Sequence, residues 1–170
     1  MKVADLLLQD FDAEMASTRR VLERIPDDKP EYKPHEKSFE MGRLAMHVAT
    51  LPVFGKTILT TPSLDMANPM QPRPDMTFRT REITVATFEA AANALRAALT
   101  AASDEDLEAK WKFSFGDYLI MDAPRSQTYR MLFFNHLVHH RAQLGVYLRL
   151  NDIPVPGIYG PSADEPFAPK

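Results

Sequence analysis

The sequence predicts an all-α protein, a four-helix bundle with a short β-hairpin between its third and fourth helices. Its 170 residues are 45% hydrophobic and 25% charged, which suits one globular domain with a single core. The 14 prolines fall in groups and leave long proline-free segments between them. In these segments apolar residues recur at three- and four-residue steps, the period of an amphipathic helix. We therefore expect one domain over residues 1–170, built as a bundle.

The first two helices are expected at about 3–25 and 39–59. Ser38 precedes the second helix, and serine is a favoured N-cap residue because its hydroxyl accepts from an unpaired backbone N–H. Each segment carries one apolar stripe for the core. In the first helix the stripe contains Val3, Leu7, Phe11, Met15, Val21, Leu22 and Ile25, and in the second Leu44, Leu51, Phe54 and Ile58.

The last two helices are expected at about 79–102 and 124–150. The third combines a sparse apolar stripe with many alanines. The fourth starts near Pro124, since proline fits the first turn of a helix, where its missing N–H is not needed.

A hairpin and a tail complete the predicted fold. In the segment Trp111–Met121, Phe113 and Phe115 alternate with polar residues, and Gly116-Asp117 supplies a turn. Residues 151–170 are rich in proline and glycine but contain isolated apolar residues. We expect this tail to wrap the surface on a fixed path.

Composition excludes several classes of function. Twenty Lys and Arg against 23 Asp and Glu give a net charge of −3, whereas a general nucleic-acid binder needs a basic surface. The absence of cysteine excludes disulfides, Cys-ligated metal sites and a protein thiol nucleophile. No signal peptide or membrane-spanning run is evident. We expect a cytoplasmic protein without nucleic-acid or membrane partners.

Two histidines of the fourth helix share its apolar face. His136 and His140 are four residues apart, so their side chains project only about 40° apart around the helix. This spacing suits one metal ion, although the intervening Glu of the zincin motif is absent. Two core histidines that are hydrogen-bonded to neighbours or water explain the spacing equally well.

His47 lies on the apolar stripe of the second helix. Three inward imidazoles without partners would cost about 1–3 kcal/mol each, and one divalent cation satisfies all three. Three neutral imidazoles with an open position resemble a catalytic zinc site. Imidazole-only ligation favours zinc or nickel over magnesium or calcium.

Several segments resemble the DinB/YfiT-like superfamily over nearly the whole chain. Two are specific to its DinB side: His136-Leu-Val-His-His-Arg-Ala-Gln143, and the closing Tyr159-Gly-Pro-Ser-Ala-Asp-Glu165. The others are residues 14–25, 34–38 and 44–48. Ala142 stands where the common pattern has glycine, a small departure.

The resemblance implies a metal-binding four-helix bundle with a triad that matches His47, His136 and His140. It also implies a homodimer. Some branches are thiol-dependent transferases or isomerases, and many members, among them DNA-damage-inducible ones, have no assigned reaction.

Three further residues are weaker candidates for the site. Glu14 interrupts the first apolar stripe and could orient a ligand imidazole or act as a general base, or simply reach solvent. His139 adjoins a proposed ligand but points about 100° away from it, which favours a supporting or surface role. Tyr147 shares the histidine face and could contact a ligand, although packing with a bonded hydroxyl is commoner.

The leading hypothesis is therefore a DinB-like protein that binds one divalent metal ion through His47, His136 and His140. The resemblance alone suggests that it is a metal-dependent thiol S-transferase or a related enzyme acting on an unknown small molecule. Because the chain has no cysteine, the thiol must be a low-molecular-weight one. A metal-dependent hydrolase and a non-enzymatic, stress- or damage-inducible metal-binding module are the alternatives.

Overall fold

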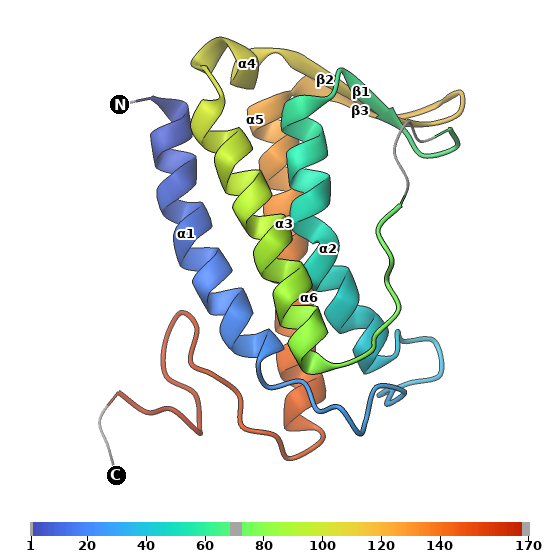
Figure 1. The fold of residues 1–170 in the computed structure, drawn as a ribbon, viewed down its shortest axis with the longest axis vertical. Coiled ribbons are helices and arrows are strands. Elements are labelled where there is room, and N and C mark those ends of the chain that lie inside the picture. Colours follow the sequence, from blue (N-terminus) through green and yellow to red (C-terminus); the bar gives the residue numbers. More distant parts are fainter. Residues whose placement is uncertain (1, 69–72, 168–170) are drawn as a thin grey trace.

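Four long helical segments lie side by side, and a small sheet covers one end of them (Figure 1). The computed structural model describes residues 2–68 and 73–167. Within these residues α3 (Arg81–Ala101) packs between α1 (Val3–Leu22) and α2 (Met41–Thr60), and α6 (Asn135–Arg149) packs against α2. The predicted four-helix bundle is confirmed.

The first three helices differ from the predicted ranges mainly at their ends. Helix α1 ends at Leu22, three residues early, and α2 begins at Met41 instead of after Ser38. Glu40, not Ser38, occupies the N-cap position of α2 and makes no side-chain cap hydrogen bond. In α3 the Thr80 hydroxyl caps the helix by accepting from the backbone N–H of Ile83 at 3.2 Å.

The predicted fourth helix is not uniform. A short helix α5 (Arg125–Thr128) leads into a π-helix η1 (Tyr129–Phe134), and α6 follows directly. The wider turn is visible where the N–H of Asn135 donates to the carbonyl of Arg130, five residues back. π-Helical segments of this kind often occur at functional sites.

The β element is larger than predicted. Strands β2 (Lys110–Phe115) and β3 (Tyr118–Pro124) form the expected antiparallel hairpin, after a short helix α4 (Asp104–Glu108). A third strand, β1 (Ser63–Asp65), pairs parallel with β2. The protein is therefore an α-helical bundle with a mixed three-stranded sheet, and the all-α prediction was incomplete.

The core lies between the helices and reaches the sheet. Trp111 of β2 is fully buried, and its indole N–H donates to the Thr61 hydroxyl. Gly55 lets α2 approach its neighbours closely, since a Cβ there would lie 2.6 Å from Leu95 of α3 and 2.9 Å from Phe133 of η1.

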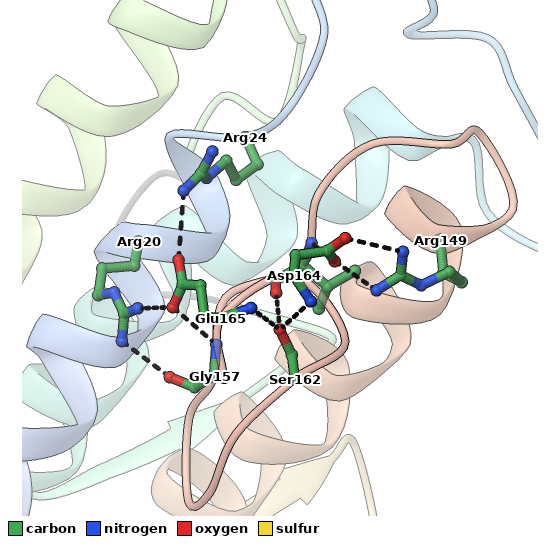
Figure 2. Close-up of polar contacts among 8 residues, drawn as sticks. Arg20, Arg24, Arg149, Gly157, Ser162, Asp164 and Glu165 are labelled. Carbon is green, nitrogen blue, oxygen red and sulfur yellow. Dashed lines mark hydrogen bonds and ion pairs between the residues drawn. The ribbon is translucent and has the colours of Figure 1, made fainter. Parts of the chain in front are cut away.

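The tail follows a fixed path along the lower ends of α1 and α6 (Figure 1). Figure 2 shows how it is held: Glu165 pairs with Arg20 of α1 and with Arg24 just after that helix, and Asp164 pairs with Arg149 of α6. The expected wrapping therefore describes residues 151–167, while residues 168–170 lie outside the described part of the chain.

Candidate metal centre

The three histidines of the predicted triad meet between α2 and α6. His47 Nε2 lies 3.3 Å from His136 Nε2, which lies 2.8 Å from His140 Nε2. The three potential ligand nitrogens are all within 4.8 Å of one another. The i, i+4 spacing on α6 and the apolar stripe of α2 thus produce the convergence that the sequence predicted.

Hydrogen bonds on the far side of two rings fix their orientation. His136 Nδ1 lies 3.2 Å from the carbonyl oxygen of Leu132, in η1, and His140 Nδ1 lies 2.7 Å from Gln143 Oε1. Both partners are acceptors, so each Nδ1 carries the proton and each Nε2 is left with a lone pair. The helix pattern did not predict these roles, although the i, i+3 spacing of Gln143 from His140 could have suggested the second.

The environment keeps the triad uncharged at neutral pH. Burial, helped by the neighbouring His140, His136 and Arg43, lowers the pKa of His47 from 6.5 to about 4. Burial also lowers the pKa of both His136 and His140. Neutral imidazole is the form that binds metal ions.

The donor set fits a divalent transition-metal ion. Two Nε2 lone pairs that face each other at 2.8 Å repel, and a cation between them removes the repulsion. Tetrahedral ligands at zinc–nitrogen distances of 2.0–2.1 Å stand about 3.3 Å apart, close to the spacing between His47 and His136. Among the described residues, the group contains only imidazoles and no carboxylate. The identity of the metal stays a prediction.

A pocket of about 440 Å³ opens beside the triad. His47 and His136 form one part of its lining. The rest comes from α2, from β1 and β2, from η1 and from the segment 73–76, which runs alongside α2 (Figure 1). Most of these side chains are apolar, among them Leu51, Phe54, Leu64, Met76, Phe113 and Leu132.

Glu14 contacts an arginine and a tyrosine, not a triad imidazole. Its carboxylate is buried, pairs with Arg141 and accepts from the Tyr159 hydroxyl at 2.9 Å. Arg141 is itself buried and also donates to the Thr18 hydroxyl. The carboxylate on the α1 stripe thus balances an arginine on α6, a partner that the helix pattern did not reveal.

Tyr147 and His139 also lie outside the group of three nitrogens. The Tyr147 hydroxyl donates to the carbonyl oxygen of Phe39 at 2.9 Å, which matches the alternative of a packed tyrosine with a hydrogen-bonded hydroxyl. His139 is exposed, and its ring lies beside that of His140 with centroids 4.8 Å apart.

The fold and the site together define a four-helix bundle of the DinB type with a histidine triad in its interior. The model of the DinB family matches residues 1–169, and the chain belongs to this family. It is 26% identical over 162 residues to YrdA, an uncharacterized protein of Bacillus subtilis, covering 95% of this chain and 90% of that protein.

Solved structures share the fold. A DinB-like protein of Bacillus cereus matches with a TM-score of 0.66 and 21% identity, covering 89% of this chain and 95% of that one. The DinB-like YjoA of B. subtilis matches with a TM-score of 0.69 and 21% identity, covering 90% and 97%. YfiT of B. subtilis, described as a probable metal-dependent hydrolase with an unusual four-helix bundle topology, matches with a TM-score of 0.63 and 14% identity, covering 88% and 87%.

Among the residues that the structure describes, no helix combines the length and apolar character needed to cross a membrane.

Proposed function

We propose that the protein binds one divalent transition-metal ion through His47, His136 and His140 and transfers a low-molecular-weight thiol to a small electrophilic molecule. The observation that carries the proposal is the convergence of three neutral imidazole nitrogens at the edge of an open pocket. When bound, a divalent ion supplies Lewis acidity, which holds a coordinated thiol as thiolate and lowers the pKa of coordinated water to about 7.

The residues of the site have two roles, to bind the ion and to orient the rings that bind it. The three Nε2 atoms would hold the ion, while Leu132 and Gln143 hold two of the rings in the tautomer that would bind it. The pocket receives the second molecule beside His47 and His136. In the transfer, the thiol gives its proton to solvent, its sulfur forms a bond to carbon, and the leaving group departs with its bonding electrons.

The absence of an acidic side chain at the pocket favours a thiol over water. The pocket lining in the described residues contains no Asp or Glu, so no carboxylate stands ready as a general base for water. A coordinating thiol needs no such base because it is deprotonated outright, whereas metal-bound water with a pKa of about 7 is only partly ionised at neutral pH without one.

Metal-dependent hydrolysis is the second candidate, and the description of the structurally similar YfiT favours it. Because imidazole ligands leave the charge of the ion uncompensated, water also ionises readily in such a site.

Cobalt substitution tests the proposal. The cobalt-loaded protein is titrated with glutathione and with bacillithiol, and the visible spectrum is followed. We expect a thiolate-to-cobalt charge-transfer band in the wild type and no cobalt binding by His140→Ala. His139→Ala, which removes the exposed neighbouring imidazole, is the matched control and keeps the band.

The outcomes separate the candidates. A cobalt spectrum that neither thiol changes, together with metal-dependent cleavage of activated esters, supports the hydrolase. Less than about a tenth of an equivalent of metal per chain after reconstitution overturns both.

A further inference from the structure

The pocket beside the triad is apolar but carries one permanent charge. Among its described lining residues, Arg73 is the only one that is charged at neutral pH, since the two histidines there are neutral. Its guanidinium donates to the carbonyl oxygen of Met66 at 2.9 Å. A guanidinium has five N–H groups in a planar fork, so most of its donors remain available to a ligand.

Nearby carboxylates are engaged elsewhere. Asp65 accepts from the backbone N–H groups of Gly116 and Ala67 at 2.8 and 2.9 Å, which lowers its pKa. Asp75 accepts from the backbone N–H of Thr77 and pairs with Arg79. Neither carboxylate belongs to the pocket lining. The described lining therefore carries one positive charge and no negative one, and a divalent ion held by neutral imidazoles would add to the positive charge.

The walls specify the rest of the ligand. Leu51, Phe54, Leu64 and Phe113 offer aliphatic and aromatic surface, and the volume of about 440 Å³ lies in the range of small-molecule sites. Such walls favour an apolar or aromatic body over a sugar or a nucleotide.

We propose that this pocket binds a small molecule with an apolar body and one carboxylate, and that the carboxylate pairs with Arg73. The Arg fork matches the two oxygens of a carboxylate, and a single arginine in an apolar pocket suits a monoanion. The proposal rests on the proposed function in one respect: the reacting group of this molecule then faces the triad.

The only tryptophan of the chain reports on this pocket. Trp111 is fully buried, and its ring stacks on that of Phe113 with centroids 6.0 Å apart and planes inclined by 18°. It also meets Phe54 edge-on at 6.3 Å. Both phenylalanines line the pocket, so a ligand that presses on them changes the surroundings of the indole.

The experiment compares 4-phenylbutyrate with its neutral amide, 4-phenylbutyramide, in the metal-free protein. Binding is followed by Trp111 fluorescence and, independently, by calorimetry. We expect the carboxylate to bind about fivefold more tightly than the amide, the advantage of one partly exposed ion pair. Arg73→Gln should remove this difference, while Arg81→Gln, a matched change at an exposed arginine outside this lining, should keep it. Thr57→Phe, which fills part of the pocket, should weaken both ligands.

Each outcome decides the proposal. Equal affinity for acid and amide, a preference that survives in Arg73→Gln, or no binding by either method overturns it. Because the metal-free protein is used, a carboxylate preference that depends on Arg73 stands even where metal binding and thiol transfer fail. The titration is repeated after zinc is added. If the affinity for the carboxylate still depends on Arg73, the proposal is supported. If the affinity no longer depends on Arg73, the carboxylate binds zinc instead, which contradicts the proposed orientation.

Discussion

Removing the side-chain amide of Gln143 should weaken metal binding without affecting the fold. Gln143 is exposed, and its Oε1 accepts from His140 Nδ1 at 2.7 Å. Gln143→Leu keeps the approximate volume but removes the acceptor, so the His140 ring loses the group that fixes its tautomer and angle.

The expected magnitude follows from this one hydrogen bond. A neutral hydrogen bond contributes a net free energy of about 0.5–1.5 kcal/mol, which corresponds to about two- to tenfold in an equilibrium constant. Loss of such a partner in other metal sites costs about 10–100-fold, and the exposure of Gln143 places this case near the lower limit. We therefore expect zinc affinity to fall about tenfold. Gln143→Glu should raise the zinc affinity, because a carboxylate accepts the Nδ1 hydrogen bond more strongly and makes the imidazole a stronger metal ligand.

A competition titration with a chromophoric zinc chelator measures these affinities. Gln127→Leu is the matched control, since Gln127 is also exposed and its amide donates to Met131 Sδ instead of an imidazole. Equal zinc affinities for wild type, Gln143→Leu and Gln143→Glu would show that His140 is oriented by packing alone, and would refute the reasoning.

Three further predictions concern the triad and the buried ion pair. His47→Ala should bind less than about a tenth of an equivalent of zinc while the metal-free variant melts within a few degrees of the metal-free wild type; a large loss of melting temperature would instead indicate a structural metal. Since burial lowers the pKa of His47 from 6.5 to about 4, the unfolded chain takes up a proton in this window that the folded chain does not. The free energy of unfolding of the metal-free protein should therefore decrease as the pH falls from about 6.5 to about 4, and urea titrations should show a shallower decrease for His47→Ala; equal slopes would contradict this. Glu14→Leu should lower the free energy of unfolding, measured by urea denaturation, by about 3 kcal/mol, because it leaves the Arg141 charge buried without a carboxylate. Adding Arg141→Met should recover part of this loss, and a double variant less stable than Glu14→Leu would refute the pairing.

Periodicity predicted the parts of the structure that depend on one helix face. The apolar stripes located the helices to within a few residues, and the i, i+4 spacing placed His136 and His140 on one side of α6. His47 could be assigned to the same interior because Leu44 and Leu51 flank it, one turn away on each side, on the apolar stripe of α2.

What the sequence did not reveal depends on irregular or non-local geometry. Strand β1 has three residues, too few for an alternating pattern, and its pairing with β2 joins residues about fifty positions apart. Nothing in the sequence of η1 distinguishes it from an α-helical segment. The π-helical turn that contains Leu132, whose carbonyl oxygen contacts His136, therefore could not be predicted. The pocket depends on both features, because β1 and η1 contribute to its lining.

Glu14 pairs with Arg141 of α6, the residue next to a triad histidine, and not with an imidazole. Arg141 follows His140 in sequence, so the two side chains leave α6 about 100° apart. The pairing of Arg141 with Glu14 and with the Tyr159 hydroxyl fixes how far α6 is rotated about its own axis. A rotation of 20° would move a side-chain atom about 5–6 Å from the axis by about 2 Å, the length of a metal–nitrogen bond. We therefore expect the buried ion pair on one face to keep His136 and His140 in line with His47 on the other, so that the tail, which supplies Tyr159, contributes to the site without touching it.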